Sequence, residues 1–426
     1  MTFRPNIGGI YAPVQSNPPL LPSGFEPIAL RFFRLRQICV HDADCSLEAE
    51  PVAQHPFLDF LRFLPCLPKM KKALVAGALG VTGRTLVNHL VSLGDWEVFG
   101  LSRRSPEFQT AAKYVAVDLS DRSAVESQLS GIGDVTHIFY AALYWGKNAF
   151  DEVGPNLAML TNLVETVEHT SKQFRKVVLL EGAKYYGAHL GPYKTPAKED
   201  DPRHMPPNFY YDQEDYLKTQ SAGKSWSWSA LRPSAICGFA VGNPMNMATV
   251  IAVYAVLCKQ MGLPLRFPGT TKAYGGIMEM TDADLLAKAI VWAGENDSCD
   301  GEGFNITNGD FNRWANLWPR LAEYFKMDYG LPQHLPLTQF MSDKGPIWQR
   351  LVKQHGLLDY SFEAAVSWPF GEAVFNIEYD VMSDTTKSRR YGFLEWVDTE
   401  EMLFRLFTQF QKMRFIPALA DNMGSE

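Results

Sequence analysis

Ala73-Leu-Val-Ala-Gly77-Ala-Leu-Gly80-Val-Thr-Gly83 is the stretch that decides the fold of this 426-residue chain. It begins with a short apolar run that stops at a glycine, which predicts a strand buried on both faces of a parallel sheet. The residues from Arg84 to Leu93 follow, and their leucines recur at helical spacing. A glycine loop between a strand and a helix is the context in which such a loop binds a dinucleotide.

The glycines of this loop have different predicted roles. Gly77 lets the chain turn, Gly80 lets the backbone approach a pyrophosphate, and Gly83 lets the helix pack closely on the strand. The helix N-terminus adds free N–H groups and the positive end of a dipole. The spacing G-x-x-G-x-x-G resembles that of extended and atypical short-chain dehydrogenases. The residues predicted to contact the cofactor here are Gly77, Leu79, Gly80, Val81, Thr82 and Gly83.

The second predicted strand, Trp96 to Leu101, is followed by Ser102, Arg103 and Arg104. Proteins that bind NAD usually place a carboxylate there, where it accepts hydrogen bonds from the adenosine ribose. Two guanidinium groups would instead attract a 2′-phosphate. The sequence therefore predicts NADPH/NADP as the cofactor, with these three residues in contact with it. The alternative is a pair of ordinary surface arginines.

Further strands are predicted from Tyr114 to Leu119, from Val135 to Ala142 and from Val177 to Leu180. Strands that alternate with helices imply an α/β protein with a Rossmann-type, doubly wound parallel sheet and right-handed crossovers. The third strand places Asp118 against the adenine, and the fourth ends at the cofactor. The predicted cofactor contacts at these strand ends are Asp118, Leu119 and Ala141.

The composition is that of an ordinary globular protein, with 46% apolar residues, 20% charged residues and a net charge of −7. Such a chain has no general attraction for nucleic acid. The six cysteines are sparse and unpaired in spacing, which is typical of a reducing compartment and predicts a cytoplasmic protein. The longest apolar run, Met247 to Cys258, is too short to span a bilayer and predicts a buried helix. No metal site is predicted.

Residues 1–69 differ from the rest because they hold ten of the 27 prolines. We interpret them as a disordered extension or as upstream sequence included in the chain, and the alternative is a regulatory or targeting arm. The predicted domains are therefore this extension, an NADP-binding Rossmann domain at 70–240, and a mixed C-terminal part at 241–426. That last part is expected to be smaller and mainly helical, to cap the substrate site, and to return some segments to the sheet.

The catalytic pair of ordinary short-chain dehydrogenases, a Tyr and a Lys four residues later, occurs at none of the 17 tyrosines. Two segments after the fifth strand offer another arrangement: Glu181-Gly-Ala-Lys184-Tyr-Tyr-Gly187, and Pro207-Asn-Phe-Tyr210-Tyr211-Asp-Gln-Glu214-Asp215. They resemble the hallmark segments of the progesterone 5β-reductases and iridoid synthases. These are atypical short-chain dehydrogenases that reduce activated C=C bonds. The resemblance covers roughly Met70 to the C-terminus and continues through Arg232-Pro233-Ser-Ala-Ile236-Cys-Gly-Phe239, Thr281-Asp-Ala-Asp284, Phe304-Asn-Ile-Thr-Asn308-Gly-Asp310 and Tyr391-Gly-Phe393.

This resemblance implies that Lys184 and Tyr210 are the catalytic residues and that both also contact the cofactor, with Tyr211 as the rival tyrosine. It implies cofactor contacts at Pro233 and Ile236 as well. A phenol O–H aimed at the substrate carbonyl would stabilise the charge that hydride transfer creates. A nearby ammonium would make that phenol more acidic and hold the cofactor ribose.

The chain also departs from the family pattern. Glu181-Gly182 replaces a Thr-Gly pair, and this carboxylate is expected to shift the charge balance or to bind a polar substrate. Ala141-Ala-Leu-Tyr144-Trp145 replaces a Val-Thr-Trp-type segment. Overall the chain is closer to fungal or bacterial relatives in secondary metabolism than to the plant steroid reductases.

In the C-terminal part, helices are predicted at Ala248 to Cys258, Asp282 to Ala293, Trp314 to Phe325 and Glu400 to Phe410. Its aromatic residues either line an apolar substrate pocket or, as we favour for each of them singly, pack in the core. The aromatic residues concerned are Trp348, Trp368, Phe370 and Phe375.

Three functions follow from these patterns. The leading hypothesis is an NADPH-dependent reductase of an enone, enal or ketone in a hydrophobic small-molecule substrate such as a terpenoid, steroid or polyketide. The alternatives are an NAD(P)-dependent epimerase or dehydratase, and a non-catalytic NADP-binding regulatory protein. Whether the chain forms a homodimer is left open, as are the identity of the substrate and the choice between C=C and C=O reduction.

Overall fold

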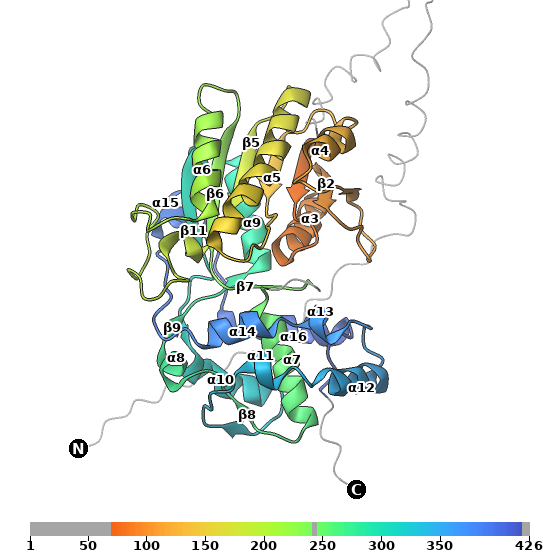
Figure 1. The fold of residues 1–426 in the computed structure, drawn as a ribbon, viewed down its shortest axis with the longest axis vertical. Coiled ribbons are helices and arrows are strands. Elements are labelled where there is room, and N and C mark those ends of the chain that lie inside the picture. The colour runs from red at the N-terminus through yellow and green to blue at the C-terminus, as the bar shows by residue number, and fades with distance from the viewer. Residues whose placement is uncertain (1–69, 241–244, 420–426) are drawn as a thin grey trace, which may run out of the picture. The chain divides into compact units, whose positions relative to one another are not determined.

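The computed structural model describes residues 70–240 and 245–419 (Figure 1). The interpretation of residues 1–69, including Cys39, Cys45 and Cys66, lies outside the described residues. Residues 1–68 and 69–426 form separate units, and only the second is described below.

A seven-stranded sheet with only parallel pairings organises this unit, in the order β11-β6-β5-β4-β1-β2-β3. This is the Rossmann order extended by one strand, so the predicted fold class is confirmed. All five predicted strands are present, although their bounds differ by a few residues. The bounds are β1 Lys71–Ala76, β2 Trp96–Ser102, β3 Lys113–Ala116, β4 His137–Tyr140, β5 Lys176–Leu180, β6 Ser227–Pro233 and β11 Glu302–Ile306.

Helices cover both faces of the sheet, because alternate residues of each strand are apolar on both sides. On β1, Ala73 and Val75 pack into one core and Leu74 and Ala76 into another. The first core contains residues of α3 (Val81–Leu93) and α9 (Ala283–Glu295). The second contains residues of α4 (Arg122–Leu129), α5 (Ala149–Thr170) and α6 (Phe209–Gln220).

The switch point of the sheet lies between β1 and β4. The chain leaves β1 for β2 on one side and leaves β4 for β5 on the other, so the loops after these neighbouring strands diverge. In open α/β sheets, ligands bind in the crevice that such a divergence creates at the carboxyl ends of the strands. The glycine loop after β1 and the segment that begins at Ala141 after β4 therefore border the expected ligand site.

A third core, built mainly from helices, lies in the C-terminal part (Figure 1). Its central helix, α7 (Met247–Gln260), is buried along nearly its whole length, as its apolar sequence predicts. The four predicted C-terminal helices are present. Of this part of the chain, α9 packs on one face of the sheet and β11 is one of its strands. The longer helices after α9 are α10 Trp314–Tyr324, α12 Gly345–His355, α14 Trp368–Phe375 and α16 Thr399–Lys412.

Short elements complete this part. The short helices are α8 Thr271–Gly275, α11 Leu337–Phe340, α13 Phe362–Ala365 and α15 Thr386–Arg390. The two-residue strands pair as β7 Ile236–Cys237 with β10 Thr281–Asp282, β8 Leu265–Arg266 with β13 Tyr329–Gly330, and β9 Ile277–Met278 with β12 Asn312–Arg313.

The four aromatic residues considered as pocket-lining residues belong to this helical core. Trp348, Trp368 and Phe375 are buried within it, and Phe370 packs against it. The indole N–H of Trp348 donates to the Tyr360 carbonyl at 3.1 Å, which satisfies its one polar group. The core-packing interpretation therefore describes these residues.

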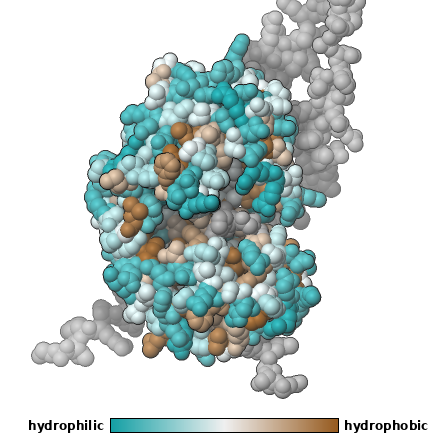
Figure 2. All heavy atoms as spheres, viewed as in Figure 1, coloured by the Kyte–Doolittle hydropathy of each residue, from teal (hydrophilic) through white to brown (hydrophobic). Residues whose placement is uncertain are grey.

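The molecular surface drawn in Figure 2 is mainly hydrophilic, with apolar residues scattered over it. Across residues 70–240 and 245–419, no helix is long and apolar enough to cross a membrane. The same residues contain no cluster of three or more His, Cys, Asp or Glu side chains suited to a metal ion. Cys237, Cys258 and Cys299 are buried free thiols.

Candidate active site

The glycine loop lies directly against the segment that follows β4. Gly77 has a φ of +78°, and a Cβ atom there would lie 2.6 Å from the Ala141 carbonyl oxygen. A Cβ atom on Gly83 would lie 2.2 Å from the Gly77 carbonyl oxygen. Both positions therefore require glycine, for the backbone turn and for the close approach of α3 to β1.

The N-terminus of α3 offers unused hydrogen-bond donors. Gly80 is its N-cap residue and supplies no side chain that could cap the helix. The backbone N–H groups at Val81, Thr82 and Gly83 belong to the first turn, where a helix has no internal acceptors. An anion placed there would accept these donors and meet the positive end of the helix dipole.

The residues predicted to contact the adenosine half lie at the ends of β2 and β3. Arg103 and Arg104 are exposed beyond Ser102, and neither side chain forms an ion pair with a described residue. Hydrogen bonds from Ser120 lower the pKa of Asp118, and Arg103 contributes to the same effect. The side chain of Leu119 is buried in the core, so only its backbone can contact a ligand.

Lys184 lies in the turn that follows β5, a short 3₁₀ helix at Ala183–Tyr186. Its ammonium Nζ donates to the Glu152 carboxylate at 2.6 Å and lies 4.8 Å from the centre of the Phe209 ring. Glu152 is buried in the first turn of α5, where the helix dipole stabilises its negative charge. The two charges therefore neutralise each other inside the site.

Asn208 holds Lys184 and Tyr210 in one place, although they are 26 positions apart. Its side-chain amide donates to the Lys184 carbonyl at 3.0 Å, and its side-chain oxygen accepts from the Tyr210 backbone N–H at 3.2 Å. Asn208 is thus the N-cap of α6, and its amide also links this helix to the turn after β5 through a hydrogen bond. The Tyr210 hydroxyl lies 3.5 Å from the position of a Cβ on Gly182, two residues before Lys184.

The two adjacent tyrosines have different surroundings. The Tyr211 hydroxyl is buried and donates to the Tyr185 carbonyl at 2.5 Å. Tyr210 is half-buried, and its hydroxyl makes no hydrogen bond within the part of the chain that the structure describes. Of these two tyrosines, Tyr210 is therefore the one whose hydroxyl the described residues leave free for a ligand.

Burial raises the pKa of the Tyr210 phenol, and the negative charges of Glu181 and Glu152 raise it further. The Lys184 ammonium is paired with Glu152, so the expectation that Lys184 makes this phenol more acidic stays a prediction. Tyr210 is consequently a neutral hydrogen-bond donor at ordinary pH.

Glu181 is part of a buried network of charged side chains. Its side chain is fully buried and accepts from the Arg232 guanidinium at 2.7 Å, and Arg232 also donates to Glu214 at 2.9 Å. Burial raises the pKa of Glu181 to about 7, although Arg232 opposes the shift. Because Glu214 lies one helical turn after Tyr210, the network fixes α6 against the sheet. The second carboxylate oxygen, Oε1, is buried without a hydrogen-bond partner among the described residues, so the expectation that Glu181 binds a polar substrate stays a prediction.

Pro233 lies beside the turn that carries Lys184, and Ile236 lies beside the start of α3. The Pro233 carbonyl oxygen lies 3.4 Å from the position of a Cβ on Gly182. Ile236 packs against a small apolar cluster that contains Val81 of α3. The end of β6 and the start of β7 therefore connect the glycine loop with the turn that carries Lys184.

The sequence analysis predicted no role for four residues of the site, although the last three stand in the segments that carry the family resemblance: Glu152, Asn208, Arg232 and Glu214. Asn208 had a readable signal, since an Asn directly before a helical stretch is a preferred N-cap. Glu152 had none, because it pairs with a lysine 32 positions later.

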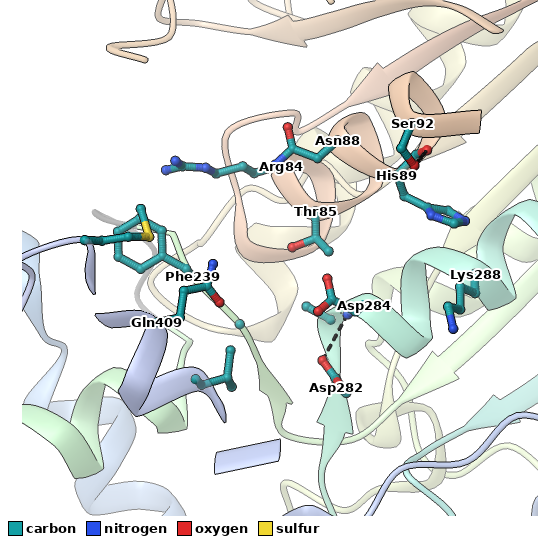
Figure 3. Close-up of a pocket in the computed structure, with 14 residues that line it drawn as sticks. Arg84, Thr85, Asn88, His89, Ser92, Phe239, Asp282, Asp284, Lys288 and Gln409 are labelled. Atoms are coloured by element: carbon teal, nitrogen blue, oxygen red, sulfur yellow. Dashed lines mark hydrogen bonds between the residues drawn. The ribbon is translucent and has the colours of Figure 1, made fainter. Parts of the chain in front are cut away.

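A cavity of about 520 Å³ has neither Lys184 nor Tyr210 in its lining. Arg84, Thr85, Asn88 and His89 line it from α3, facing the start of α9 (Figure 3). Residues of α16, among them Gln409, complete its lining.

The strand order, the glycine loop and the divergent loops at the switch point define a Rossmann-fold protein of the extended short-chain dehydrogenase type. The chain belongs to the family of PRISE-like Rossmann-fold domains, whose family model matches residues 117–417. This confirms the resemblance to the progesterone 5β-reductases and iridoid synthases.

The curated relatives match the chain over most of their length. An (S)-8-oxocitronellyl enol synthase of Nepeta cataria is 33% identical over 367 residues, which cover 81% of this chain and 92% of the relative. A 3-oxo-Δ(4,5)-steroid 5β-reductase of Arabidopsis thaliana is 32% identical, with 81% and 93% covered. Among solved structures, a UDP-glucose 4-epimerase of Thermotoga maritima has a TM-score of 0.60 at 18% identity. That match covers 80% of this chain and 99% of the epimerase, and it supports the fold alone.

Proposed function

We propose that this protein is an NADPH-dependent reductase of an activated C=C bond or a ketone in a hydrophobic metabolite, such as a terpenoid or steroid. The observation that carries the proposal is that hydrogen bonds of Asn208 bring Lys184 and Tyr210 together. The Tyr210 hydroxyl has no hydrogen-bond partner among the described residues. The names of the relatives, an enol synthase and a steroid reductase, support the same reaction class.

The residues around the switch point fit a nicotinamide dinucleotide. Glycine is required at Gly77 and Gly83, and the first turn of α3 has free N–H donors. Arg103 and Arg104 form no ion pair with a described residue. Together these features suit a pyrophosphate and a 2′-phosphate. NADPH, when bound, would supply the hydride.

The remaining chemistry falls to the residues of this chain. Tyr210 would donate a hydrogen bond to the substrate carbonyl oxygen, where negative charge develops as the hydride arrives. Lys184, whose ammonium is paired with Glu152, would hold the cofactor ribose beside the turn after β5. A donor of this kind contributes about 10²- to 10³-fold to turnover, so Tyr210 would account for a large part of the rate.

The matched pair Tyr210→Phe and Tyr211→Phe tests the proposal. Purified protein is mixed with NADPH and a panel of enones, enals and ketones, and the loss of NADPH absorbance is followed. We expect Tyr210→Phe to lower kcat by about 10²-fold or more with cofactor affinity retained. Tyr211→Phe should keep turnover and lose about 1 kcal/mol of stability, because its hydroxyl bonds only inside the protein.

Two other results would contradict the proposal. Retained kcat in Tyr210→Phe would remove this phenol from the mechanism. No oxidation of NADPH by wild-type protein with any substrate would favour a regulatory NADP-binding protein, and conversion of a nucleotide sugar without net NADPH consumption would favour an epimerase.

A further inference from the structure

Arg84 follows Gly83 in the first turn of α3 and takes part in none of the interactions described so far. Helical side chains tilt toward the N-terminus of their helix, and Figure 3 shows Arg84 extending away from α3 beside Phe239. Its guanidinium carbon lies 4.0 Å from the centre of the Phe108 ring and 5.0 Å from the centre of the Phe239 ring. Ring contacts of this kind hold a guanidinium without using its N–H donors.

The charge of Arg84 lacks a counterion within residues 70–240 and 245–419. The side chain is half-buried, and no described carboxylate forms an ion pair with it. Burial lowers its pKa, and no carboxylate opposes the shift. The more deeply buried Arg232, by contrast, is paired with two carboxylates. Because buried charges in proteins are normally paired, the surroundings of Arg84 indicate a missing anion.

The position of Phe108 places this charge near the adenosine half of the cofactor site. Phe108 follows Arg104 by four residues, and its ring contacts the Tyr114 ring edge-on at 6.3 Å. The Tyr114 hydroxyl donates to the Ala78 carbonyl of the glycine loop at 3.4 Å. Arg84 therefore adjoins both the glycine loop and the segment that carries Arg103 and Arg104.

We propose that Arg84 is a third arginine that binds the adenosine 2′-phosphate, together with Arg103 and Arg104, and thereby determines the preference for NADPH. The inference rests on the proposed function. A phosphate monoester carries nearly two negative charges and several acceptor oxygens, which suits a cluster of forked guanidinium donors.

Binding measurements test this without a substrate. Dissociation constants for NADPH and NADH are measured by titration calorimetry for wild type, Arg84→Gln, Arg84→Lys and the control Arg122→Gln. Arg122 is an exposed arginine on α4 whose charge is already paired with Glu126 and Glu165. Two fragments, 2′-AMP and ADP, serve as competitors that carry the 2′-phosphate or the pyrophosphate alone. Thermal unfolding verifies that each variant is folded.

We expect Arg84→Gln to weaken NADPH and 2′-AMP about 10- to 100-fold, the range for hydrogen bonds to a charged group. NADH and ADP should change by less than about threefold, Arg84→Lys should keep part of the affinity, and Arg122→Gln should match wild type. Equal losses for NADPH and NADH, or no loss for either, would overturn the proposal. If wild-type protein binds NADH as tightly as NADPH, the assignment of NADPH in the proposed function is wrong as well. An unchanged NADPH preference in Arg84→Gln refutes the role of Arg84 alone.

Discussion

Substitutions at Asn208 should show separately how much each of its two side-chain hydrogen bonds contributes to the free energy of unfolding. In Asn208→Ala, α6 loses its N-cap, which costs about 1 kcal/mol. The Lys184 carbonyl loses the amide donor at 3.0 Å but keeps a contact with the His204 ring at 3.3 Å, so this loss is about 1 kcal/mol. The sum is about 2 kcal/mol in the free energy of unfolding.

Asn208→Ser is the matched variant, because serine caps a helix almost as well but has no amide to reach Lys184. It should lose only about 1 kcal/mol. Urea unfolding followed by circular dichroism gives both values, provided that the dependence on urea is unchanged between variants. If the alanine and serine variants were equally stable, Asn208 would not cap α6, and the account of how Tyr210 is positioned would be wrong.

Two further predictions concern the carboxylates near Tyr210. Glu152→Gln removes a negative charge that raises the pKa of Tyr210, so the alkaline limb of the kcat–pH profile should move to lower pH; an upward shift would contradict this. The Glu181 carboxyl has a folded-state pKa of about 7, above its usual 4.5, so its stabilising contribution is complete below pH 4.5 and is lost as pH rises through 7. Urea unfolding at pH 5 and pH 8 should show a smaller difference for Glu181→Gln than for wild type, by roughly 3 kcal/mol at most.

The fold could be predicted because its signals are local. The apolar run at Ala73, the glycine loop and the alternation of strands and helices all lie within short windows of sequence. Strand ends were less accurate because they depend on the partner strand. The prediction ran to Leu119, whereas β3 ends at Ala116, where its pairing with β2 ends at Ser102.

The site was predictable only in part. The residue types and the family resemblance pointed to Lys184 and Tyr210, but no spacing rule could connect them. The partner of Lys184 comes from α5, and the network behind Tyr210 joins the ends of β5 and β6 to α6. Such pairings depend on which elements the topology brings together, and the linear sequence does not record this.

The double attachment of α6 has a consequence for the range of compounds this scaffold can serve. Asn208 anchors the helix at its start and Glu214 anchors it a turn later, so the backbone that carries the Tyr210 phenol is held in place when different substrates bind. Any adaptation must come from the walls around it. Tyr144 and Trp145 follow β4 with about half of each residue exposed, and we expect them to line the substrate side of the site. Because exposed loop residues on a fixed scaffold often set specificity, we expect substitutions at Tyr144 and Trp145 to change substrate selectivity while the hydrogen bonds that position Tyr210 stay in place.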